Sequence, residues 1–176
     1  MAKPRKMLGS YQDPHIEALM RLIETQSKST IAHWCIDYAE KHHLPIYLKT
    51  YPGDNRPLEA LHAARRWLAG EIKLPEAKKI ILDRCHQAAR EAEEHPAAQT
   101  AARCLGHAAS TIHTPTHSLG IAFYGAAAVA YDRVGIGQKA EVYRKIAEEE
   151  GAKMLLALQA IAVENEPNPA KINWNC

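Results

Sequence analysis

Alanine constrains this chain more than any other residue: it occurs 30 times in 176 residues, whereas valine occurs four times, threonine seven times and phenylalanine once. Alanine is the best helix former, while strands favour β-branched and aromatic side chains. The composition therefore argues against an all-β fold and predicts an all-α fold. A chain of this length is the usual size of one domain.

Prolines and apolar spacing divide the chain into about seven helices joined by short loops. Asp13-Pro14 gives an N-cap followed by proline in the first turn, which is a typical helix start. Further starts are expected at Ser27 to Thr30, at Asp54 or Asn55, at Leu74-Pro75, at Pro96, after Pro115 and at about Ala140. Pro45 ends the second helix or begins a short extra turn. The last helix is expected to reach about Val163, with Ile161 facing inward.

The segment near residues 117–133 is apolar almost all round, which is typical of a buried helix. We expect it at the centre of a single compact bundle, and it is shorter than the roughly 20 apolar residues of a membrane span. The expected organisation is a flexible N-terminal segment (1–12), an all-helical domain (13–164) and an irregular tail (165–176) rich in proline and asparagine.

Charge and cysteine usage favour a cytoplasmic protein. The 22 basic and 20 acidic residues nearly balance, and no basic stripe of the kind nucleic-acid binders carry is visible. The four cysteines form no CxxC pair, so free thiols in a reducing compartment are expected. Residues 1–12 are basic without a following apolar run, so no signal peptide is expected. Nucleic acid and membrane are therefore not expected partners.

The ten histidines are the main candidates for chemistry. His113 and His117 stand at i and i+4, a spacing that lets two imidazoles share one metal ion on a continuous helix, and His86 is a third candidate. Pro115 between the first two weakens that geometry. The chain contains neither HExxH nor GxSxG, and no phosphate-binding glycine loop. We therefore predict no catalytic site, no cofactor and no bound metal, and the histidines can simply fill polar positions between alanine-rich helices.

A polar stripe follows one side of the helix that starts at Pro96. Its members recur at steps of four, four, three and four residues: Gln99, Arg103, His107, Ser110 and Thr114. The stripe is either a solvated face or a contact surface anchored by Arg103, because arginine is enriched at interface hot spots.

Three motifs, taken in order, resemble a known family. They are Tyr51-Pro52-Gly53-Asp54-Asn55-Arg56-Pro57 with Trp67 and Gly70 behind it; Cys85-His86-Gln87-Ala88-Ala89-Arg90; and Ala102-Arg103-Cys104-Leu105-Gly106-His107-Ala108-Ala109, running into His113-Thr114-Pro115-Thr116-His117. Over about residues 30–135 the set resembles the all-helical "immunity protein five-like" family of bacterial polymorphic toxin systems.

The resemblance implies a small cytoplasmic helical protein that binds and neutralises a cognate protein toxin, without catalytic residues or a cofactor. The positions that match the family's motifs are Asp54, Arg56, Trp67, His86, Arg90, Arg103, His107, His113 and His117. At the helix start, Asp54 can act as a cap while Arg56 pairs bidentately with a carboxylate. His86, Arg103 and His113 could equally form a buried polar network between two alanine-rich helices.

Net charge narrows the choice of partner. An inhibitor of a basic nuclease is expected to be acidic, whereas this chain carries a formal charge of +2. The target is then not a strongly basic nuclease, or the contact is mainly apolar. Two other functions stay open: a histidine-rich metal-binding protein or metal-dependent enzyme using His86, His113 and His117, and a structural protein that buries the polar stripe in a homodimer.

Overall fold

The computed structural model describes residues 4–175, and within that range it contains helices and no strand. The elements are α1 (Pro14–Glu24), α2 (Lys28–His42), α3 (Leu44–Thr50), α4 (Arg56–Leu68), α5 (Leu74–Ile81), η1 (Leu82–His86), α6 (Gln87–Glu91), α7 (Pro96–Ser110), η2 (Pro115–His117), α8 (Ser118–Val134) and α9 (Ala140–Gln159). η1 is a π-helical turn and η2 a 3-10 turn. The prediction of an all-α bundle is confirmed.

The seven expected helices correspond to α1, α2, α4, the continuous run from α5 through η1 to α6, α7, α8 and α9. The extra turn expected at Pro45 is α3, which begins at Leu44. Asp13 caps α1 by accepting the His15 N–H at 2.7 Å.

Two helices end earlier than expected. α7 stops at Ser110, so Thr114 of the polar stripe lies beyond it, and α9 stops at Gln159, where Ile161 is 46% exposed rather than inward-facing. The reason for the earlier end of α9 is a contact with α1's end, where the Gln26 side chain accepts the Val163 N–H at 2.8 Å and donates to its carbonyl at 3.2 Å.

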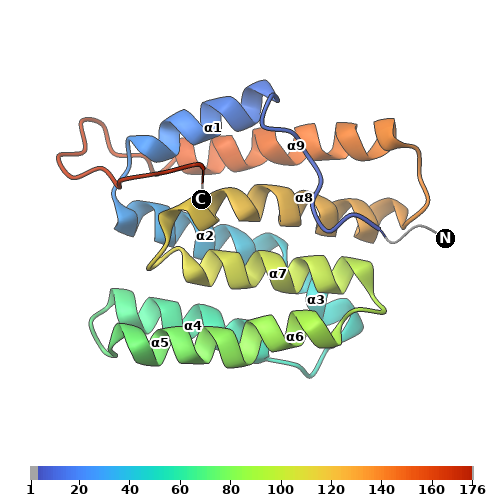
Figure 1. Ribbon diagram of the computed structural model, residues 1–176, viewed down its shortest axis with the longest axis horizontal. Helices are drawn as coiled ribbons and strands as arrows, with labels where there is room; N and C mark the ends of the chain where they lie inside the picture. The colour runs from blue at the N-terminus through green and yellow to red at the C-terminus, as the bar shows by residue number, and fades with distance from the viewer. Residues whose placement is uncertain (1–3, 176) are drawn as a thin grey trace.

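The helices lie roughly parallel to one another, as Figure 1 shows. α7 and α8 form the central pair; α9 and then α1 follow on one side, and α4, α5 and α6 on the other. α2 packs behind both central helices. The apolar segment expected at the centre is α8, whose residues from Ile121 to Tyr131 are buried except for Tyr124.

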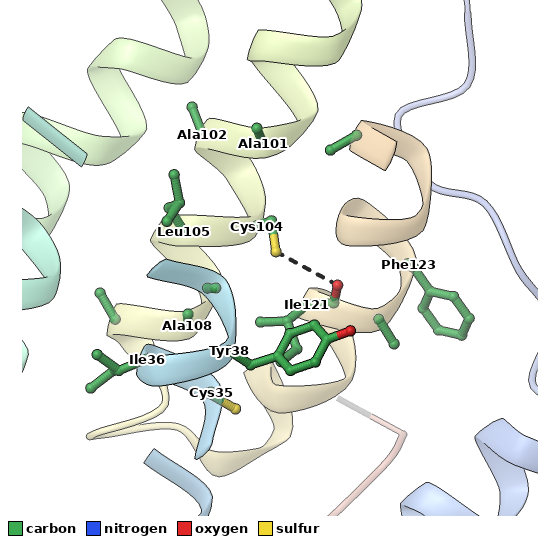
Figure 2. Close-up of a cluster of buried hydrophobic side chains, with 14 of the residues drawn as sticks. Cys35, Ile36, Tyr38, Ala101, Ala102, Cys104, Leu105, Ala108, Ile121 and Phe123 are labelled. Atoms are coloured by element: carbon green, nitrogen blue, oxygen red, sulfur yellow. Dashed lines mark hydrogen bonds between the residues drawn. The ribbon is translucent and has the colours of Figure 1, made fainter. Parts of the chain in front are cut away.

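Small side chains allow α7 to pack closely on its neighbours. Figure 2 shows its buried alanines, with Leu105 and Cys104, against Cys35 and Tyr38 of α2 and against α8. The Cys104 thiol donates to the Ile121 carbonyl at 3.6 Å. Burial raises the thiol pKa values of Cys35, Cys85 and Cys104, which are all free. Thiols in such an environment are poor nucleophiles; the fourth cysteine, Cys176, lies outside the described residues.

Both ends of the described chain are tied to the bundle by hydrogen bonds to their backbone groups. Residues 4–12 cross α8 (Figure 1), where the Leu8 N–H donates to the Phe123 carbonyl at 3.1 Å and the Tyr131 hydroxyl donates to the Arg5 carbonyl at 2.6 Å. In the tail, the Ala170 N–H donates to the Gln26 carbonyl at 2.8 Å. No described helix combines the length and apolarity needed to cross a bilayer.

Candidate functional site

Asp54 and Arg56 form a lock at the start of α4, as the first motif predicts. Asp54 Oδ1 accepts the Arg56 backbone N–H at 3.1 Å and Nε–H at 2.9 Å, and Oδ2 accepts from Nη2 at 2.6 Å. The Tyr47 hydroxyl adds a fourth donor at 2.6 Å, and Arg56 Nη1 pairs with Glu91 at 2.7 Å. The lock therefore joins α3, α4 and α6.

Replacing Asp54 with asparagine should lower the free energy of unfolding by about 2 kcal/mol at pH 7. Hydrogen bonds from Arg56 hold the pKa of the carboxyl at about 2, below its ordinary 3.8, so its stabilising effect is complete above pH 3.8 and is lost as the pH falls towards 2. Urea unfolding at pH 7 measures the loss. Asp132→Asn is the control: its partner, Lys49, is largely exposed, so a loss below about 1 kcal/mol is expected. Equal losses would show that the lock is no stronger than a surface pair.

The second motif contains the π-helical turn η1, which places two consecutive side chains against one residue of α7. A methyl group built at Gly106 would lie 3.3 Å from His86 Cε1 and 3.4 Å from Cys85 Sγ. Neighbouring side chains of a helix point about 100° apart, so Gly106 lies in the space between these two. Single π-turns are frequent at functional sites. Here the turn brings His86 onto α7 while Cys85 stays buried.

Three further imidazoles gather where α7 leads through η2 into α8. The His107 ring centre lies 4.8 Å from that of His117 and 4.9 Å from that of Tyr124, and His113 and His117 are 6.2 Å apart. A methyl group at Gly120 would overlap the His107 ring, at 2.8 Å from Cγ. Glycine at this position is therefore what allows the ring to lie on α8.

Together these residues form what we call the histidine–arginine cluster. Its members come from η1, α6, α7, η2 and the loop before η2: His86, Arg90, Arg103, His107, His113 and His117. Arg90 is exposed, and the other five side chains are half-buried. Nδ1 of His107, His113 and His117 and Nε of Arg103 are buried without a hydrogen-bond partner among the described residues.

The charge of the cluster is positive, and it comes from two arginines that have no acidic partner in the described chain. Neither arginine forms an ion pair within residues 4–175, and the charged neighbours that act on the four imidazoles are Lys78, Arg90 and Arg103. Burial, with smaller contributions from His117, His86 and Arg103, lowers the pKa of His107 to about 4. Burial also lowers the pKa of His86, His113 and His117. The imidazoles are therefore neutral at pH 7.

The other predicted positions lie apart from the cluster or behind it. Trp67 is half-buried on α4 and packs against the apolar core. Within the polar stripe, Gln99 and Ser110 are buried, and the Gln99 side chain donates to the Ala89 carbonyl at 3.1 Å. Only Arg103, His107 and Thr114 of the stripe reach the surface. No group of three or more His, Cys, Asp or Glu side chains within residues 4–175 is arranged to hold a metal ion.

Replacing Arg103 with alanine should change the free energy of unfolding by no more than about 1 kcal/mol, because the side chain is half-exposed and has no ion-pair partner among the described residues. A thermal melt of both proteins measures the difference. A loss of about 3–5 kcal/mol would instead place Arg103 in a buried, paired network.

Sequence reasoning missed the glycines and two neighbours of the cluster. The imidazoles of His86 and His107 pack against Gly106 and Gly120, and the Tyr124 ring lies against His107. The positive charge of Lys78 helps to lower the pKa of His113. Glycine destabilises a helix relative to alanine. A glycine within an alanine-rich helix is therefore the available signal that a neighbouring side chain leaves no room for a methyl group.

The geometry defines an all-α protein whose motif residues converge on a half-exposed basic cluster without an arranged metal site in the described chain. A family model described as Imm-5 like putative immunity protein matches residues 21–157, and the chain belongs to this family. The family suspected from the motifs is thereby confirmed. No curated protein and no solved structure matches the chain.

Proposed function

We propose that this protein is an immunity protein of the bacterial cytoplasm that binds a cognate protein toxin and neutralises it without catalysis. The observation that carries the proposal is membership of the immunity-protein family over residues 21–157. The arrangement of the site supports a binding role: six of the nine motif positions meet in the histidine–arginine cluster, and its two arginines reach the surface without an ion-pair partner in the described chain. A charged side chain that has no ion-pair partner and reaches the surface is available to an oppositely charged partner.

Co-expression with the toxin-like reading frame beside its own gene tests the proposal. We expect restored growth of the host and a complex that survives affinity purification and size-exclusion chromatography. Absence of both rescue and complex would overturn it. Two measurements test the alternative functions. Light scattering that shows an obligate homodimer burying Arg103 and His107 would favour a structural protein. Stoichiometric zinc, iron, nickel or manganese in untagged protein would favour a metal-binding protein or enzyme.

The cluster is the proposed toxin-contact surface, and charge reversal tests this directly. The double variant Arg90→Glu/Arg103→Glu should lose rescue while remaining folded, because both side chains are unpaired and neither is fully buried. Arg21→Glu is the matched control: Arg21 is exposed on α1, which packs on α9 rather than on α7. Full rescue by the double variant would place the toxin contact elsewhere.

A further inference from the structure

A second basic region lies beside the histidine–arginine cluster. The start of α2, the loop before η2 and the C-terminal tail line a cavity of about 650 Å³ that is open to solvent. The charged side chains that line it are Lys28 and Lys171, and no carboxylate lines it. His113 belongs both to this cavity and to the cluster, so the two are continuous. In Figure 1 the C-terminal tail runs past the start of α8, next to the loop before η2 that lines the same cavity.

We call the combined surface the basic face. It carries five cations and four imidazoles: Lys28, Lys78, Arg90, Arg103, Lys171, His86, His107, His113 and His117. None of the five cations pairs with a described residue, whereas six other arginines of the chain do. Every charged side chain that lines the cavity or acts on the four imidazoles is basic, so positive charge predominates on this surface although the whole chain is nearly balanced.

Helix ends add to the positive potential of the basic face. α2 begins at Lys28 and α8 at Ser118, and neither helix has an acidic residue in its first turn. The N-terminus of a helix carries a partial positive charge, which acidic residues of the first turn normally offset. The side chains and the helix ends therefore favour the same kind of partner.

From these observations we infer that the basic face binds an acidic surface of the toxin, made of aspartate and glutamate side chains, and that its imidazoles take up protons as the complex forms. The inference rests on the proposed function for the identity of the partner. Carboxylates complement the unpaired cations, and a carboxylate docked beside the half-buried imidazoles would favour their protonated form. The near-neutral charge of the whole chain leaves the choice of partner open, and the local predominance of positive charge favours an acidic one.

Proton uptake follows from what surrounds each imidazole. The groups facing the four rings are Lys78 of α5, Arg90 of α6, Arg103 of α7 and Tyr124 of α8, with Lys28 and Lys171 beyond His113. In the free protein, burial and these cations keep the rings neutral. A carboxylate placed nearby favours the charged form, so the imidazoles bind protons on docking. Affinity should therefore rise as the pH falls from 8 to 6.

Calorimetric titration of the purified complex tests the inference on the full chain. We expect the Kd to tighten by about ten-fold from pH 8 to pH 6, with proton uptake visible as a dependence of the heat on the buffer. Arg103→Glu and the double variant Lys28→Glu/Lys171→Glu should each weaken binding by at least about ten-fold, while Arg21→Glu leaves it unchanged. Unaltered affinity in both basic-face variants and across this pH range would overturn the inference while leaving the proposed function intact.

A probe that needs no toxin separates the two proposals. A short poly-L-glutamate peptide should bind at pH 6, shift the imidazole NMR signals of the four histidines, and bind more weakly to Arg103→Glu. Arg103→Gln, which removes the charge without reversing it, should show an intermediate loss. Tighter binding of a single-stranded oligonucleotide of equal charge would overturn the inference in favour of a nucleic-acid surface, as would failure of the peptide to bind. Binding of the peptide without any toxin complex would support an acid-binding face and remove the proposed function.

Discussion

Replacing Gly125 with alanine should lower the free energy of unfolding by about 3 kcal/mol, near the upper end of what overpacking a core usually costs. A methyl group at this position of α8 would lie 2.6 Å from His43 Nε2 and 3.0 Å from Met154 Cε. Neither neighbour can move into solvent, because both side chains are fully buried between α2, α8 and α9. The imidazole and the methionine side chain must therefore repack within the core. Urea unfolding with the linear-extrapolation free energy measures the loss.

Two further variants make this result interpretable. Gly53→Ala is the matched control, since nothing lies within 4 Å of its added methyl group and its φ is not positive, so a change within about 0.5 kcal/mol is expected. The double variant Gly125→Ala/His43→Ala no longer has the imidazole that the new methyl group would meet. Its loss of unfolding free energy should therefore be smaller than the sum of the two single-variant losses. Equal stability of the two glycine variants would mean that α8 does not approach His43 closely.

The glycines also mark the boundary of what could be predicted. Helix positions followed from local signals: proline in the first turn, N-caps such as Asp13, and apolar spacing within each segment. The Asp54–Arg56 lock was equally predictable, because two residues within one turn need no knowledge of the rest of the fold. Local chemistry therefore specified the helices and one of the motifs.

Contacts between helices could not be predicted from the sequence. The motif residues His86 and His107 were identified, but their meeting depends on a π-turn and on Gly106 and Gly120 accepting the rings. A π-turn shifts the side-chain direction of every later residue, and no residue type specifies one. Arg103 could be read as an interface anchor or as part of a buried network, and only its half-exposed position without an ion-pair partner in the described chain favours the first.

The tail illustrates a third case, in which a distant residue decides a local boundary. Helix-favouring sequence continues past Gln159, but Gln26 holds the backbone of Val163 with two hydrogen bonds and ends the helix earlier. Nothing near Val163 in the sequence signals a partner so far away along the chain. Ile161 consequently faces solvent beside the equally exposed Val163.

Acid should destabilise the protein by about 4 kcal/mol between pH 7 and pH 5, which is the largest effect we expect from any single change of conditions. Burial lowers the pKa of His43 to about 3 and that of His107 to about 4, from an ordinary 6.5. Below pH 6.5 the unfolded chain binds protons that the folded chain does not, so stability falls with pH, by about 1.4 kcal/mol per unit for each group. His43 and His107 together, over the roughly 1.5 pH units between pH 6.5 and pH 5, account for the loss of about 4 kcal/mol.

Other groups do not cancel this effect within the same window. The pKa values of His42, His86, His113 and His117 are also lowered by burial, so each adds destabilisation of the same sign. Asp54, whose pKa is depressed, loses its contribution only below pH 3.8. Urea unfolding at pH 7, 6 and 5 measures the slope, and equal stability at pH 7 and pH 5 would contradict the assignment of neutral, buried imidazoles.

Single variants show how much of the pH dependence of stability comes from the core and how much from the basic face. His43→Leu removes a fully buried imidazole whose two nitrogens have no hydrogen-bond partner in the described chain, and it should reduce the loss between pH 7 and pH 5 by about 2 kcal/mol. His107→Asn should reduce it by a similar amount. Because packing changes alter stability equally at both pH values, the slope isolates the titration. Only the second variant should also weaken the pH dependence of binding to an acidic partner, since His43 lies in the core and His107 on the basic face.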